Sequence, residues 1–150
     1  MNQKEVITEF YKAFQQLDAE KMVSFYHEEV VFEDPGFGRL EGERAKNMWR
    51  MLCNNAKEFT LEFSEITDNS AHWEPKYTFS QSGRRVHNII DASFEFQDGK
   101  IIKHTDVFNL HHWSKQAIGV KGWLLGGTSF FRKKLQQQTG KLLDKYEARK

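Results

Sequence analysis

Residues 86–109 read VHNIIDASFEFQDGKIIKHTDVFN, and this stretch predicts an antiparallel β-hairpin. Aromatic and β-branched side chains favour one long strand from Val86 to Gln97. The pair Asp98-Gly99 is the strongest hairpin-turn signal in the chain. Ile101 to Asn109 then returns as the second strand. The C-terminal half of the fold is therefore expected to be built on a β-sheet.

Two more strands are expected before the hairpin. Phe59, Leu61 and Phe63 alternate with polar residues, which indicates a strand with one buried face. Residues 73–79 repeat the pattern, and Pro75 within them indicates a sheet edge or a bulge, because proline cannot donate a ladder hydrogen bond. A short strand at 30–32 precedes these.

Three helices are predicted in the first 58 residues. Apolar residues recur at helical spacing in each segment. Asn2 can cap the first helix and Asp18 the second. Their apolar faces contain Val6, Phe10, Ala13, Phe14 and Leu17, then Met22, Val23, Phe25 and Tyr26, then Ala45, Met48, Trp49, Leu52 and Ala56. Helices followed by an antiparallel meander define an α+β class with one covered sheet face, and we expect a single domain.

The composition excludes several kinds of protein. The chain has 150 residues and a formal charge of +1, whereas nucleic-acid binders are usually strongly basic. Cys53 is the only cysteine, so a disulfide within the chain and a cysteine-only zinc site are excluded. No signal peptide or membrane-spanning stretch is recognised, so the reducing cytoplasm is the expected compartment. Aromatic residues make up 14%, which suits a core and also the wall of an apolar pocket.

Two stretches resemble the nuclear transport factor 2-like superfamily, in particular the SnoaL-like polyketide cyclases and the ketosteroid isomerases. The first runs from Asp18 to Pro35 and includes Val31-Phe32-Glu33-Asp34-Pro35 without a gap. The second runs from Ile89 to Phe108. The resemblance implies a cone-shaped curved sheet around N-terminal helices, over residues 1–109, with a deep pocket. It also implies a homodimer formed through the convex sheet face.

The resemblance also implies catalytic residues. Asp34 lies where the isomerases keep their general base, and the alternative is that Asp34-Pro35 simply begins a turn. Tyr11 lies near the position of the oxyanion-binding tyrosine of the isomerases. The match requires one residue fewer between the first two helices than the isomerases have. Tyr11 can also be a partly exposed tyrosine that packs on the sheet. Asp91 resembles the second oxyanion donor of the ketosteroid isomerases. That donor is an aspartic acid that apolar surroundings keep neutral.

The orientation of Asp91 has two possible readings. Asp91 shares a strand face with His87, Ile89, Ser93 and Glu95, and the opposite face is more apolar. Either the polar face lines the pocket, as the family pattern implies, or it faces outward, as simple burial implies. We take the first as the prediction.

A second acid/base centre is possible on the last strand. His104, Asp106 and Phe108 alternate on one face, so the imidazole and the carboxylate of this pair lie side by side. They are either a catalytic couple or a structural hydrogen-bonded pair. Phe14, Trp49 and Phe108 are the expected pocket-lining side chains. No metal motif, phosphate loop or dinucleotide fingerprint is present, so no cofactor is expected.

The last 41 residues differ from the short isomerases. Residues 110–150 contain nine basic and two acidic residues, a charge of +7, which leaves −6 for residues 1–109. A final helix capped by Thr128 or Ser129 is predicted. Its apolar side either covers the pocket mouth or the outside of the barrel, or the basic tail contacts an anionic membrane or an acidic partner.

The sequence thus supports two functions. The first is an enzyme that transfers protons without a cofactor, an isomerase or cyclase acting on a small, largely apolar molecule. The second is a non-catalytic protein that binds such a molecule in the same cavity.

Overall fold

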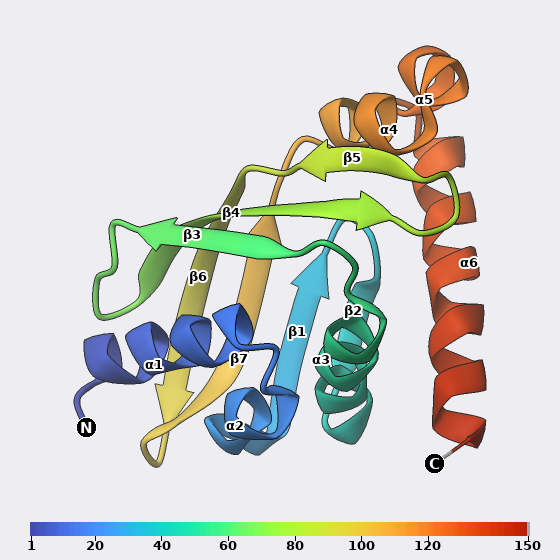
Figure 1. The fold of residues 1–150 in the computed structure, drawn as a ribbon. Helices are drawn as coiled ribbons and strands as arrows, with labels where there is room; N and C mark the ends of the chain where they lie inside the picture. Colours follow the sequence, from blue (N-terminus) through green and yellow to red (C-terminus); the bar gives the residue numbers. More distant parts are fainter. Residues whose placement is uncertain (150) are drawn as a thin grey trace.

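The N-terminal helices follow the predicted apolar spacing. The computed structural model describes residues 1–149. Asn2 and Glu5 form a capping box at the start of α1 (Gln3–Gln15), and Asp18 caps α2 (Ala19–Ser24). The third helix, α3 (Glu43–Asn55), buries Ala45, Met48 and Trp49. These helices lie in the concave side of the sheet (Figure 1).

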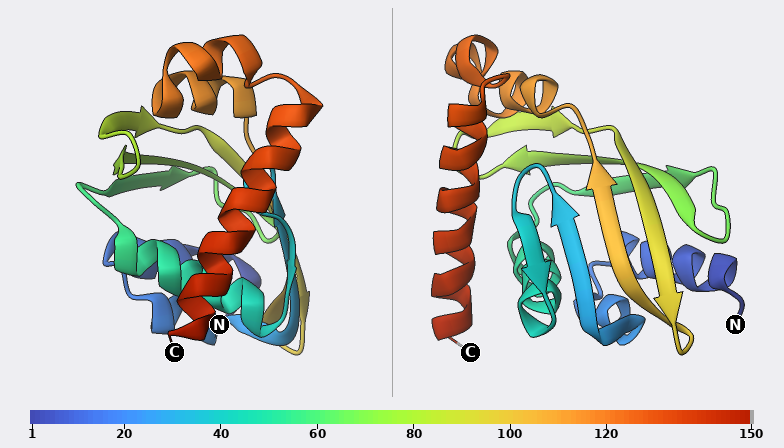
Figure 2. Two further views of the ribbon diagram at one scale, coloured as in Figure 1. Left: turned by 90° about the vertical axis from the view of Figure 1, so that its right-hand side faces the viewer. Right: turned by 180° about the vertical axis from the view of Figure 1, so that it is seen from behind.

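One curved, unclosed sheet of seven strands is formed by residues 1–149. Its strands are β1 (Tyr26–Asp34), β2 (Gly38–Glu41), β3 (Thr60–Ser64), β4 (Ser70–Phe79), β5 (Arg84–His87), β6 (Ile90–Gln97) and β7 (Lys100–Val107). Their order is β2-β1-β7-β6-β4-β3, and β5 also pairs with β4. Only the β1–β7 pair is parallel within the described chain. The α+β class and the cone-like curvature are confirmed (Figures 1 and 2).

The strand predicted from Val86 to Gln97 is two strands. β5 and β6 both pair with β4, and Asn88 and Ile89 between them leave the ladder. Pro75 lies at the same level of β4, and its carbonyl accepts a hydrogen bond from the Asn88 N–H at 3.0 Å. The irregularity occurs where proline removes a ladder donor. It directs Asn88 into the interior, where it is 4% exposed.

The turn predicted at Asp34-Pro35 is present and leads into β2, so that Asp34 pairs with Gly38 across it. One local prediction was wrong. Tyr26, expected at the end of the second helix, begins β1 and is buried. Periodicity alone does not locate such boundaries, because short apolar runs fit a helix or a strand equally well.

The C-terminal residues form three helices, α4 (Leu110–Ile118), α5 (Val120–Leu125) and α6 (Ser129–Ala148). Thr128 caps α6 through its side chain. Near the other end of α6, Arg44 of α3 forms ion pairs with Asp144 and Glu147, and the Asn47 amide donates to Glu147 at 2.8 Å. α6 therefore stands along the side of the molecule beside α3 (Figure 2).

Candidate functional site

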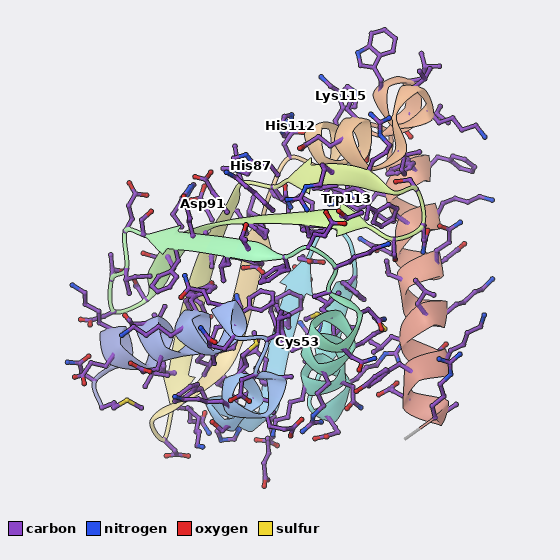
Figure 3. All side chains as sticks on the ribbon, in the orientation of Figure 1. Cys53, His87, Asp91, His112, Trp113 and Lys115 are labelled. Carbon is purple, nitrogen blue, oxygen red and sulfur yellow. The ribbon has the colours of Figure 1, made fainter. Side chains whose placement is uncertain are left out.

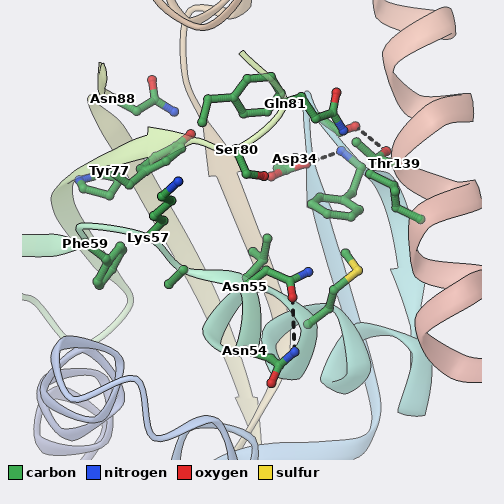
Figure 4. Close-up of a pocket in the computed structure, with 18 of the residues that line it drawn as sticks. Asp34, Asn54, Asn55, Lys57, Phe59, Tyr77, Ser80, Gln81, Asn88 and Thr139 are labelled. Atoms are coloured by element: carbon green, nitrogen blue, oxygen red, sulfur yellow. Dashed lines mark hydrogen bonds between the residues drawn. The ribbon is translucent and has the colours of Figure 1, made fainter. Parts of the chain in front are cut away.

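A cavity of about 520 Å³ lies between the concave sheet face, the end of α3 and α6. Its volume is in the range of small-molecule sites. Its walls are largely apolar, and their aromatic side chains include the predicted residues Phe14 and Phe108. Figure 4 shows polar side chains from several elements around this cavity, among them Asp34, Tyr77, Asn88 and Lys57. The cavity thus combines an apolar interior with a few polar groups.

Asp34 ends β1 and lines the cavity. Its Oδ1 accepts a hydrogen bond from the Phe37 N–H at 2.6 Å, so Asp34 begins a turn and also faces the pocket. Burial raises the pKa of its carboxyl to about 7, although the Phe37 and Gly36 N–H groups lower it and the nearby Asp106 charge raises it further. Surrounding protein removes water from a side chain that still touches the cavity, and this disfavours the charged form.

Helix α6 holds the turn that carries Asp34. The Gln136 amide donates to the Pro35 carbonyl at 3.2 Å, and the Thr139 hydroxyl donates to the Gly36 carbonyl at 2.9 Å. Backbone carbonyls within a cavity wall need such partners. The C-terminal extension thus both lines the cavity and fixes the peptide groups that follow Asp34 (Figure 4).

Tyr77 lines the cavity, although no functional role was predicted for it. Its oxygen accepts a hydrogen bond from Trp113 Nε1 at 2.8 Å. Burial raises the pKa of Tyr77, the Trp113 hydrogen bond lowers it, and the negative charge of Asp34 raises it. Because the Trp113 contact uses an acceptor position, the Tyr77 hydroxyl hydrogen remains available to a ligand. Alternation with Trp73 on one strand face was the signal that could have placed Tyr77 inside.

Asn88 is the second residue that was missed. Its side chain lines the cavity from the break between β5 and β6. An amide can donate or accept, so it suits a ligand oxygen or N–H group. Only the pairing of both strands with β4 reveals this position.

Tyr11 and Trp49 belong to the core and do not line the cavity, so the placement of Trp49 in the pocket wall was wrong. The Tyr11 side chain is 0% exposed and stacks on Phe63. Among the described residues, its hydroxyl has no hydrogen-bond partner. Burial raises the pKa of Tyr11, and so does the charge of Asp106. Rings of Phe10, Trp73 and Phe94 also lie against Tyr11, and Asp34 lines the cavity that Tyr11 does not reach.

His104 and Asp106 lie side by side but are sealed inside the protein. His104 Nε2 is 2.9 Å from Asp106 Oδ1, and the two side chains are 0% and 2% exposed. On the other side of the ring, Nδ1 is 2.7 Å from the Tyr26 hydroxyl, which accepts a hydrogen bond from Trp49 Nε1. Because the Tyr26 oxygen accepts from Trp49, its hydroxyl hydrogen is free to point at Nδ1, and a hydrogen on Nε2 can point at Asp106. Trp73, a cavity residue, donates to Asp106 at 3.4 Å and connects this network to the cavity wall.

Asp91 lies on the outer face of the sheet, so the prediction that its face lines the pocket was wrong. Ile90, Ala92 and Phe94 are buried, whereas the Asp91 side chain is 78% exposed. Asp91 pairs with His72 at 2.9 Å, and this hydrogen bond is the main reason that the pKa of His72 is raised. Burial of the more apolar face decided the orientation. Figure 3 shows Asp91 and His87 on the side of the sheet away from α1, α2 and α3.

Across residues 1–149, no group of three or more His, Cys, Asp or Glu side chains is arranged to hold a metal ion. Within the same part of the chain, no helix combines the length and the apolar character that crossing a bilayer requires.

A curved sheet that encloses a cavity with helices on its concave side defines the nuclear transport factor 2-like class. The chain belongs to the SnoaL-like domain family, which matches residues 7–104. Among curated proteins, none matches the sequence. An NTF2-like protein of unknown function from Burkholderia pseudomallei is 17% identical, with a TM-score of 0.63 over 79% of this chain and 99% of that chain.

Two enzymes share the fold at a similar level of sequence identity. An LEH-like epoxide hydrolase of M. tuberculosis is 20% identical, with a TM-score of 0.60, over 83% of this chain and 90% of that chain. SalBIII, an epoxide hydrolase/cyclase-like enzyme of pyran ring formation in the polyether salinomycin, is 20% identical, with a TM-score of 0.61, over 71% of this chain and 89% of that chain. These similarities establish the fold.

Proposed function

We propose that the cavity binds a small, largely apolar molecule and that Asp34 transfers a proton to or from it. One observation carries the proposal: a carboxyl that faces a largely apolar cavity has a pKa of about 7. A group with this pKa exists in both protonation states at neutral pH, which is the condition for efficient general acid–base catalysis. The isomerases and cyclases that the sequence resembles use such carboxyls.

In the proton-abstraction form of this chemistry, the Asp34 carboxylate removes a proton from the carbon next to a ligand carbonyl. The C–H electron pair becomes the C=C bond of an enolate, and the carbonyl π electrons move to oxygen. The Tyr77 hydroxyl and the Asn88 amide are the donors for that oxygen, in place of Tyr11 and Asp91. Protonated Asp34 then returns its proton to the enolate, so the cycle needs no cofactor.

The epoxide chemistry named for the structural relatives also requires a group that transfers a proton near neutral pH. Opening an epoxide requires a proton for the departing oxygen, and a carboxyl that is protonated near neutral pH can supply it. Both reactions therefore predict a pH optimum set by Asp34. Homodimer formation through the outer sheet face and a cytoplasmic location remain predictions.

The test measures proton exchange directly. In D₂O, we expect the protein to accelerate α-hydrogen exchange of small cyclic ketones, followed by NMR, with an inflection near the Asp34 pKa of about 7. Asp34→Asn retains the acceptor for the Phe37 N–H and should lower the rate by roughly 100-fold or more. Asp91→Asn, which changes an exposed aspartate, is the matched control and should leave the rate unchanged. A carboxyl-carbon titration of Asp34 near 4, with binding unaffected in Asp34→Asn, would instead identify a non-catalytic binding protein.

A further inference from the structure

Large apolar side chains are exposed at one end of the molecule, in and next to α5. Val120 is 74% exposed, Leu124 62% and Phe130 64%. Trp123 and Leu125 between them are also exposed. Five of the nine large apolar residues that are exposed within the described chain thus fall in eleven consecutive positions. α5 lies at the end of the molecule opposite the α1–α2 end (Figures 1 and 2).

The exposure follows from how α5 contacts its neighbour. Gly122 is the buried residue of α5, and a Cβ built there would lie 2.0 Å from the Ser114 carbonyl oxygen of α4. A Cβ at Gly126 would lie 2.6 Å from the Ser114 Cβ. The two helices therefore meet through glycines at backbone distance, and the large side chains of α5 point outward. No partner covers them within residues 1–149.

Charge identifies the kind of surface that would cover this patch. The sequence has no acidic residue between Asp106 and Asp144. Lys115 and Lys121 lie at the same end, with Arg132, Lys133 and Lys134 at the start of α6, and Lys134 lies 5.6 Å from the Phe130 ring centre. Figure 3 shows Lys115 beside α5. A second copy of the same patch would bring like charges together, whereas an anionic surface complements them.

We propose that residues 120–134 dock on an anionic lipid bilayer, with Trp123 and Leu124 in the headgroup region and the lysines near the lipid phosphates. Exposed aromatic and aliphatic side chains beside lysines form the usual interfacial binding pattern. The docking is peripheral. It also places the cavity near the lipid, because Trp113 of α4 and Leu135 of α6 line its wall. This inference goes beyond the proposed proton transfer and is independent of it.

The chain contains its own reporter. Trp49, Trp73 and Trp113 are at most 8% exposed, whereas Trp123 is 59% exposed. We expect the full-length protein to float with phosphatidylcholine vesicles that contain about a quarter phosphatidylglycerol, with a blue shift of Trp123 emission. Phosphatidylcholine alone, or about 0.5 M salt, should reduce binding by roughly tenfold.

Matched variants distinguish binding through this patch from nonspecific adsorption to vesicles. Trp123→Ser with Leu124→Ser, and separately Lys134→Glu, should each weaken vesicle binding by roughly tenfold or more. Val107→Ser, an exposed apolar residue on the outer sheet face, and Lys4→Glu, in α1, are the controls and should bind as the unchanged protein does. Circular dichroism checks that each variant is folded. Absence of vesicle binding by the folded protein overturns the proposal, and self-association abolished by Trp123→Ser would assign the patch to a second copy.

Discussion

Two buried tyrosines, Tyr26 and Tyr11, differ in whether their hydroxyl groups have hydrogen-bond partners. The Tyr26 hydroxyl joins Trp49 Nε1 and His104 Nδ1, each at 2.7 Å, whereas the Tyr11 hydroxyl has no partner among the described residues. A buried polar group is stabilising only when it is paired, because folding removes it from water. Identical side chains in one core are therefore expected to respond differently to the loss of one oxygen atom.

Tyr26→Phe should lower the free energy of unfolding by about 1–3 kcal/mol, since it leaves an indole N–H and an imidazole nitrogen unpaired. Tyr11→Phe should leave it unchanged or raise it by about 1 kcal/mol, since it removes an unpaired hydroxyl. Urea unfolding of the two variants and the unchanged protein measures both effects. Equal destabilisation by both substitutions would show that Tyr11 has a partner, such as a water molecule.

At the scale of elements, the cavity depends on a helix outside the matched family segment. α6 begins 25 residues after residue 104, where the family match ends, and it supplies part of the cavity wall. Through Gln136 and Thr139 it also supplies partners for the carbonyls that follow Asp34. The orientation of the candidate acid/base group is thus determined by two elements about 100 residues apart in sequence.

Thr139→Val tests this clamp. The substitution keeps the shape of the side chain and removes the hydroxyl that donates to Gly36, so the turn should open more often. The Phe37 amide, which donates to Asp34, should exchange with solvent roughly tenfold faster by NMR, because local opening governs exchange. Gln137→Ala changes an exposed position on the same helix and should leave that rate unchanged. Unchanged protection in Thr139→Val would mean that β1 and β2 alone hold the turn.

At the scale of the whole molecule, an acidic body and a basic tail divide the charge, −6 against +7. The separation leaves the total near zero but creates a basic, apolar end around α5. Within the acidic body, one carboxyl is protonated at far higher pH than it would be in the unfolded chain. The stability of the whole fold therefore depends on the protonation of a cavity residue.

That dependence has a definite sign. The Asp34 pKa rises from 3.8 in the unfolded chain to about 7 in the fold, so the folded state holds its proton more tightly. Between about pH 4 and pH 7 the free energy of unfolding should fall as pH rises, by about 2–4 kcal/mol from this group. In Asp34→Asn the free energy of unfolding should not fall in this way, because the amide does not titrate. The variant should match the unchanged protein at pH 4 and exceed it at pH 8 in thermal unfolding, and parallel curves would contradict the raised pKa.

Much of the fold could be predicted because its signals are local. Apolar spacing located α1 and α3, capping residues located helix starts at Asn2, Asp18 and Thr128, and Asp98-Gly99 located the β6–β7 turn. The α+β class followed from these segments, and the family resemblance followed from residues 18–35 and 89–108. The break at Asn88 and the start of β1 at Tyr26 were missed, since both depend on partners that lie elsewhere in the chain.

The sequence by itself determined the α+β architecture and the position of Asp34 at the end of a strand, because hydrophobic periodicity and turn chemistry act over a few residues. Only the tertiary structure decided that Asp91 faces outward, that His104 and Asp106 are sealed in the core, and that Tyr77 and Asn88 share a cavity with Asp34. Which face of a strand is buried, and how strongly a carboxyl holds its proton, depend on what packs against it from distant parts of the chain.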